Sequence, residues 1–267
     1  MRGKLLIGRS IDTGSWVHGV DPRAKLTAML LYLIAIVAVG SWPALGVAAV
    51  FSLAYMTATK IPLNYYVRAA KPLWVLMVFI FAVQCFTVTE GTVLWQIGSW
   101  TLYSGGVSLG LISASRMALL VSFTAILTFT TTPGLLNQGM AGVLKPLEAI
   151  GISAQRLTLM MSIALRFIPT ILDESQKIVK AQAARGADLR ELPWKEKGRM
   201  LVSLLVPVTV GAFRRAEELV LSMESRGFQI GAPRSEYHLL VWKRRDTWFV
   251  LSFAILAAGV LAYRFLM

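Results

Sequence analysis

The sequence predicts an all-α integral membrane protein with about five transmembrane helices and two long, kinked helices on the cytoplasmic side. Of its 267 residues, 56% are hydrophobic and only 15% are charged, whereas soluble domains carry about 25% charged residues. The net charge is +13. In a chain with several long apolar runs, this excess indicates cytoplasmic loops beside an anionic lipid surface and argues against nucleic acid as a partner.

Five apolar segments approach the length of about 20 residues that a helix needs to cross the bilayer core. These predicted spans are Leu26–Gly40, Trp42–Thr59, Pro72–Val88, Val107–Thr130 and Trp248–Leu266. The first span is short, and the sequence GSWP joins it to the second. This short link predicts a tight helical hairpin.

The charges of the links predict how these spans are oriented. The link between the second and third spans carries Lys60, Arg68 and Lys71, whereas the link between the third and fourth has no Lys or Arg. By the positive-inside rule, the first of these links is cytoplasmic and the second is external. The external link places aromatic residues beside glycines and is predicted to form an interfacial turn or a short hairpin. The N-terminus is then cytoplasmic and the C-terminus external.

The chain is predicted to have three regions. Residues 1–132 form an N-terminal transmembrane region with four spans, residues 133–245 form a cytoplasmic or interfacial region, and residues 246–267 form a C-terminal transmembrane helix. The middle region contains 17 Lys and Arg residues against 10 Asp and Glu residues. Its apolar runs are each interrupted by Arg or Pro, so neither of its longest helical patterns fits a bilayer span throughout.

Two long helices dominate this middle region. One is predicted over Gln155–Ala184 with a kink at Pro169, and the other over Glu196–Ser225 with a kink at Pro207, because an internal proline removes a hydrogen bond and bends the axis. Each is about 45 Å long at 1.5 Å per residue, which exceeds a bilayer core. Leu135–Ala149 is predicted to form a shorter interfacial helix that its own proline breaks.

Residue patterns that carry enzymatic chemistry are missing. The sequence has no G-x-x-x-x-G-K-[ST] phosphate loop and no G-x-S-x-G elbow. His18 and His238 lack metal-ligand spacing, and Cys85 is the only cysteine. Asp173 and Glu174 form the only acidic pair near an apolar run, and we interpret them as a solvated helical face. We therefore predict no enzymatic activity, no cofactor and no metal.

Arg116 lies inside the fourth predicted span. A charge at the bilayer centre costs about 2.5–3.5 kcal/mol on insertion scales, so this side chain must face the bundle interior or lie near an interface. Small neighbours favour close helix packing. A structural role is favoured over a direct contact with substrate.

A small residue, an arginine and a glycine occur together at the end of both long helices. The two triplets consist of Ala184, Arg185, Gly186, Ser225, Arg226 and Gly227. Glycine suits the position after a helix, and a basic residue suits its last turn, so one such triplet could simply end a helix. Two of them, at the tips of neighbouring helices, predict docking of both arginines onto carboxylates of a dimeric partner.

These motifs resemble one family. The sequences AARGAD and ESRGFQ resemble the paired arginine motifs of the transmembrane T component of energy-coupling factor (ECF) transporters. The stretch HGVDPRAKL, with Asp21, Pro22 and Arg23, resembles that family's N-terminal signature. The stretch ALRFIPTILDE resembles the segment that precedes the first arginine motif. The resemblance covers nearly the whole chain.

The resemblance implies a function and a set of partners. A T component joins two cytoplasmic ABC-type ATPases, alike or different, to a small membrane S component that captures a vitamin or a metal ion. The long helices would be coupling helices, with Arg185 and Arg226 docked in the two ATPases and the neighbouring small residues shaping the contact. ATP-driven motion would pass through the kinks at Pro169 and Pro207. The implied location is the plasma membrane of a prokaryote, which the chain crosses several times.

Two other functions are weighed against this one. An integral membrane enzyme acting on lipid-like substrates would need clustered acids or a metal site, and the sequence offers only the pair at 173–174. A self-contained carrier would show more polar residues within the spans and an internal repeat. Identification of the proteins that co-purify with the chain would separate the three.

Overall fold

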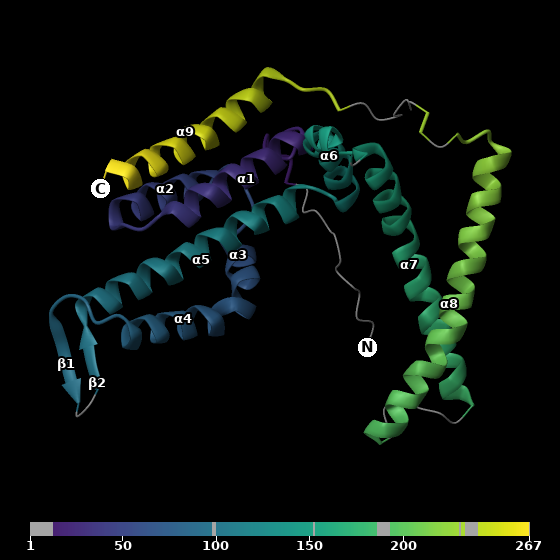
Figure 1. Cartoon of the computed structure of the whole chain (residues 1–267), viewed down its shortest axis with the longest axis horizontal. Coiled ribbons are helices and arrows are strands. Elements are labelled where there is room, and N and C mark those ends of the chain that lie inside the picture. The colour runs from purple at the N-terminus through teal and green to yellow at the C-terminus, as the bar shows by residue number, and fades with distance from the viewer. Residues whose placement is uncertain are drawn as a thin grey trace. The chain divides into compact units, whose positions relative to one another are not determined.

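We describe the protein from a computed structural model. The described residues are 13–97, 100–151, 153–185, 193–229, 231–232 and 240–266. They are almost entirely helical (Figure 1), which confirms the predicted all-α fold class. The chain divides into two compact units. One unit comprises Met1–Ala149 and Leu240–Met267, and the other comprises Ile150–Leu239.

The first unit holds most of the apolar helices. Its elements are α1 (Pro22–Ala38), α2 (Trp42–Ala58), α3 (Leu63–Ala70), the 3-10 turn η1 (Lys71–Leu73), α4 (Trp74–Thr87), β1 (Val93–Ile97), β2 (Trp100–Tyr103), α5 (Ser104–Thr130), α6 (Pro133–Leu144) and α9 (Arg244–Leu266). The second unit is built on two long helices. These are α7 (Ala154–Ala184) and α8 (Trp194–Ser225), and the 3-10 turn η2 (Lys145–Ile150) leads into them.

Three helical stretches of the described chain are long and apolar enough to cross a membrane. They are Leu63–Thr87, Ser104–Thr130 and Arg244–Leu266, and they correspond to the third, fourth and fifth predicted spans. Helices α1 and α2 have 17 residues each, which is at the short end of the range for a membrane span. That these two helices cross the membrane therefore stays a prediction. The first of these stretches, Leu63–Thr87, begins nine residues before the predicted Pro72, because α3 and η1 continue into α4 without a break.

The link predicted to be an external turn or hairpin forms a short hairpin. Strands β1 and β2 pair antiparallel, with Trp95 opposite Leu102 and an irregularity between Val93 and Trp95. The hairpin joins the end of α4 to the start of α5 (Figure 1). At the base of the hairpin the two segments of chain come close together: Gly91 has a φ of 96°, and an added Cβ there would lie 2.5 Å from the Ser104 hydroxyl.

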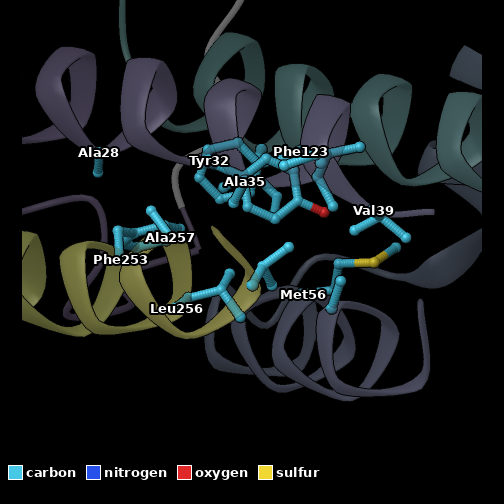
Figure 2. Close-up of a cluster of buried hydrophobic side chains, with 14 of the residues drawn as sticks. Ala28, Tyr32, Ala35, Val39, Met56, Phe123, Phe253, Leu256 and Ala257 are labelled. Carbon is cyan, nitrogen blue, oxygen red and sulfur yellow. The ribbon is translucent and has the colours of Figure 1, made fainter. Parts of the chain in front are cut away.

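The core of the first unit lies where α1, α2, α5 and α9 meet (Figure 2). Tyr32 of α1 stacks on Phe123 of α5 with ring centroids 4.2 Å apart, and Phe253 of α9 packs edge-on to Tyr32. Ala28 and Ala35 are fully buried on α1, so the backbones of α1 and α9 can approach closely. The Tyr32 hydroxyl is satisfied by the Ser52 hydroxyl of α2.

Arg116 binds the end of a neighbouring helix. Its guanidinium donates to the Val37 and Val39 carbonyls at the end of α1, at 3.3 and 3.4 Å, and to the Ser113 hydroxyl at 3.3 Å. The last carbonyls of a helix have no partners within that helix, and the C-terminal end of its dipole favours a cation. Arg116 therefore acts as a donor that closes α1, which is a structural role of the kind that the sequence favours.

Candidate functional site

The candidate site is built on α7 and α8, which have 31 and 32 residues. The Ser153 hydroxyl starts α7 by accepting the Arg156 N–H at 3.3 Å, and Pro193 precedes α8. Both helices lie within two residues of their predicted bounds. Their apolar and polar residues recur with helical spacing, so each helix is amphipathic. This is expected of a helix with one face against apolar groups and the other in water.

The second arginine motif ends α8 in a Schellman motif. The Phe228 N–H donates to the Met223 carbonyl at 3.0 Å, and the Gly227 N–H donates to the Glu224 carbonyl at 2.9 Å. Gly227 has a φ of 71°, a conformation that glycine adopts without steric cost. The glycine thus stops the helix abruptly, and Arg226 becomes the last residue before the chain turns away.

The first arginine motif ends α7 with a similar backbone. Arg185 has φ −87° and ψ 10°, close to the −93° and 10° of Arg226, while Gly186 lies outside the described residues. Ala184, Arg185, Ser225 and Arg226 are all exposed. In the described part of the chain, neither arginine forms a salt bridge. Each helix therefore presents a cation at its tip.

Helices α7 and α8 cross each other (Figure 1), and an ion pair joins them. The Arg215 guanidinium lies 2.8 Å from the Glu174 carboxylate, and both side chains are about one-third exposed. Gly211 makes room for this contact, because an added Cβ would lie 2.9 Å from Glu174 Oε1. Sequence reasoning placed Glu174 on a solvated face and missed its partner. A glycine one helical turn before Arg215 is the only signal in the sequence for this close approach.

The two arginine tips are equally far from this crossing. Arg185 follows Glu174 by 11 residues, and Arg226 follows Arg215 by 11 residues. At 1.5 Å per residue, each tip lies about 16 Å beyond the ion pair along its own helix. The first half of α7 lies beside the second half of α8, so the helices run in opposite directions. The structure therefore places the two tips at opposite ends of the pair.

The two prolines lie just before the crossing. Pro169 is five residues before Glu174, and Pro207 is four residues before Gly211. Both lie inside continuous helices, where proline removes one backbone hydrogen bond. The predicted kinks stay predictions, but their positions would put the weakest turn of each helix next to the contact between them.

An apolar groove lies between the first half of α7 and the second half of α8. Its volume is about 640 Å³, within the range of ligand-binding pockets. Its apolar lining comes from both helices and the segment after α8, and includes Leu159, Met160, Ile163, Phe167, Leu219, Met223 and Phe228. Methionine side chains adapt to differently shaped partners. The groove thus gives Met160 of α7 and Met223 of α8 a shared apolar surface.

The N-terminal signature belongs to the first unit, unlike the arginine tips. The Asp21 carboxylate accepts the Arg23 N–H at 2.8 Å and caps α1, while Pro22 occupies the first helical position. Both residue types are favoured at these positions. The signature therefore starts a helix of the first unit, which we call the membrane unit, and has no part in the candidate docking tips.

Several known proteins are similar to this chain over nearly its whole length. Residues 13–239 match the family described as CbiQ, cobalt transport protein. The energy-coupling factor transporter transmembrane protein EcfT of Bacillus subtilis (strain 168) is 38% identical over 258 residues, which cover 97% of each chain. The proteins of the same name from Listeria innocua serovar 6a and Streptococcus thermophilus are 34% and 37% identical. They cover 96% and 97% of this chain, and 97% and 98% of their own lengths.

These matches confirm the resemblance that the sequence motifs indicate. The relatives are named as membrane components of a transporter, and three helices of the described chain can cross a bilayer, so the protein is a membrane protein. Its relatives share almost their entire length with it, including the segments that form α7 and α8. The chain therefore belongs to the CbiQ family and, within it, to the EcfT transmembrane components of energy-coupling factor transporters.

Proposed function

We propose that this chain is the non-catalytic subunit that couples two cytoplasmic ABC-type ATPases to a substrate-binding S component, for uptake of a vitamin or a metal ion. The observation that carries this proposal is the arrangement of the two tips. Two exposed arginines stand 11 residues beyond one interhelical ion pair, in opposite directions. Such a pair suits a partner with two similar sockets, that is, a dimer of ATPases.

The chemistry of the tips suits docking into acidic sockets. An arginine guanidinium can bind a carboxylate through two parallel hydrogen bonds. Ala184 and Ser225, which precede the arginines, are small and exposed, so a partner's surface can approach the helix backbone. The glycines at 186 and 227 would let the chain turn away from the contact.

The groove between α7 and α8 is the proposed contact surface for the S component. Its lining is mostly apolar, and both helices contribute to it, so any change in their crossing would change its shape. We place the chain in the plasma membrane of a prokaryote, with its N-terminus in the cytoplasm and residues 133–245 in the cytoplasm or at its interface with the membrane. The charged residues of this region support that placement under the positive-inside rule.

Charge reversal at the tips tests the proposal. Arg185→Glu and Arg226→Glu should each weaken binding of one ATPase about tenfold, since a charge-assisted hydrogen bond contributes about 1.5–3 kcal/mol. The double variant should release both ATPases. The measurement is the amount of each ATPase that co-purifies with the affinity-tagged chain from detergent-solubilised membranes.

Lys180→Glu is the matched control, because it makes the same change of charge on an exposed residue of α7, away from the tip. Unchanged ATPase recovery in the double variant would contradict the docking assignment. Recovery of the chain without any ATPase, together with turnover of a lipid-like substrate, would instead indicate the membrane enzyme. Substrate transport by the purified chain alone would indicate a self-contained carrier.

A further inference from the structure

Asp246 is a buried carboxylate that neither the sequence motifs nor the docking tips explain. It is 1% exposed and is the third residue of α9. Its Oδ2 accepts the Lys243 N–H at 2.8 Å, one residue before the helix begins. This is the capping arrangement in which an acidic residue in the first turn reaches back to satisfy an N–H at the helix start.

The other oxygen of this carboxylate binds the start of a different helix. Asp246 Oδ1 accepts the N–H of Asp21 at 3.1 Å, and Asp21 is the residue that caps α1. One buried carboxylate therefore satisfies the N-terminal ends of two helices, whose dipoles both favour a negative charge there. The neighbouring Arg245 guanidinium strengthens this junction by donating to the Gly19 carbonyl.

The same short segment also fixes α6 in place. Gly139 of α6 lies so close to Pro22 that an added Cβ would come within 2.8 Å of the proline Cβ and 2.9 Å of its carbonyl carbon. An added Cβ at Gly142 would lie 2.6 Å from Arg23 Cδ. These two glycines, one turn apart, let α6 pack directly against the first turn of α1.

Lys25 holds the chain just before α6 begins. Its ammonium group donates to the Thr130 carbonyl at 3.1 Å and to the Thr131 hydroxyl at 3.0 Å. Lys25 is 4% exposed, so these bonds and one to the His18 carbonyl provide the partners that a buried ammonium group needs. The end of α5 is thus fastened to the same turn of α1 as α6.

These contacts are made by elements next to the two places where the chain passes between the units: the end of α5 and α6 on one side, and the first turn of α9 on the other. The chain leaves the first unit after α6 and returns at Leu240, shortly before α9. We define residues 18–25 as the yoke. It contacts the end of α5 and α6, which precede the outgoing connection, through Lys25, Pro22 and Arg23. It contacts the start of α9, which follows the returning connection, through Gly19 and Asp21.

We propose that the yoke transmits movement of the second unit to the membrane helices, and that Asp246 is its main positioning residue. A displacement of the second unit pulls on both connections, and both are attached to the start of α1. Because α1 packs along α9 and α5, such a pull acts on the core of the membrane unit. This inference rests on the proposed function only in taking ATP-driven motion as the source of the pull.

Two substitutions weaken the contacts of the yoke, one with α6 and the other with α9. Gly139→Ala forces α6 away from the Pro22 backbone. Asp246→Asn replaces one of the two acceptor oxygens by an NH2 group, which donates and cannot accept, so one of the two N–H groups loses its partner. Gly134→Ala is the matched control, since it lies on α6 and an added Cβ there meets nothing within 4 Å. Gly142→Ala is a milder variant, because its methyl group meets only the flexible Arg23 side chain.

The experiment uses the complex of the chain with its co-purified ATPases, in lipid nanodiscs. Cys85 is replaced by serine, and spin labels are attached through Thr57→Cys in the first unit and Lys177→Cys in the second, both exposed positions. The distance between the labels is measured without nucleotide and after trapping of ATP with vanadate. The ATP hydrolysis rate and the thermal stability of each complex are recorded in parallel.

We expect the nucleotide-dependent shift in distance to be lost in Gly139→Ala and Asp246→Asn and reduced in Gly142→Ala, while ATP hydrolysis stays at the rate of Gly134→Ala. A purely structural role would lower thermal stability and leave the shift intact, and a preserved shift in every variant that assembles would overturn the inference. A failure of the proposed function would give a different result from a failure of this inference. In that case the parent complex itself retains no ATPase or shows no shift.

Discussion

At the scale of single residues, the polar groups of the membrane unit serve to end and begin helices. Arg116 of α5 donates to a carbonyl at the end of α1, and Asp246 accepts N–H groups at the starts of both α1 and α9. Helix ends leave unpaired backbone groups, and the bilayer offers no water to satisfy them. A 17-residue helix such as α1 therefore depends on side chains from its neighbours at both of its ends.

Arg116→Met should lower the stability of the purified protein. The variant leaves the Val37 and Val39 carbonyls without this donor, and an intramolecular hydrogen bond contributes about 0.5–1.5 kcal/mol. We expect a fall in Tm, measured by thermal unfolding in detergent. Thr124→Ala is the control, because that α5 hydroxyl bonds only within its own helix. An unchanged Tm in Arg116→Met would show that these carbonyls do not depend on the guanidinium.

At the scale of elements, the crossing of α7 and α8 decides where the two tips point. Among the described residues, the crossing includes one ion pair, and one glycine lets the two helices approach closely. A partly exposed ion pair contributes only about 0.2–1 kcal/mol to stability. Its effect is therefore to select one register between two long helices, and a small energy suffices to change that register.

Glu174→Arg should disturb the crossing by placing two cations together, and it should lower the recovery of co-purified ATPases a few-fold. The double variant Glu174→Arg with Arg215→Glu restores the opposite charges and should recover most of the loss. Asp173→Arg is the control, because Asp173 is exposed and forms no salt bridge among the described residues. Equal losses in the single and double variants would show that the ion pair does not set the crossing.

At the scale of the whole molecule, hydrogen bonds place the start of α1, the end of α5 and the start of α9 on one side of the membrane unit. The β1–β2 hairpin follows α4 and precedes α5, at the opposite end of α5 (Figure 1). The loop charges likewise predict that the end of α5 and the start of α9 lie on one side of the membrane and the hairpin on the other. Which side faces the cytoplasm stays a prediction.

Cysteine labelling checks that orientation. In a background with Cys85→Ser, a cysteine in place of Glu90 should react with a membrane-impermeant maleimide in intact cells. A cysteine in place of Lys60 should react only after the membrane is permeabilised, because the positive-inside rule puts that link in the cytoplasm. Both positions are exposed, so access to solvent does not limit either reaction. The reverse pattern would show that the chain is inserted the other way.

Local patterns in the sequence are sufficient to predict where the long helices begin and end. They do not predict which side chains of different helices pair with each other. The bounds of α7 and α8 follow from amphipathic spacing and from the glycine that ends α8. Helix α9 begins at Arg244, before the predicted Trp248, because Asp246 caps the helix and makes a charged first turn favourable. The pairing of Glu174 with Arg215, and of Asp21 with Asp246, joins residues far apart in the chain. Hydrophobic periodicity carries no information about such pairs.

The bond between Asp21 and Asp246 has a consequence for how the protein is made. The two residues are separated by 225 positions, which a ribosome translates in roughly 10–45 s at 5–20 residues per second. During that interval α1 has already been synthesised, yet its first turn lacks the carboxylate that completes it. The membrane unit can therefore close only after the last helix emerges, and a chain that stops before residue 246 lacks the group needed to close it.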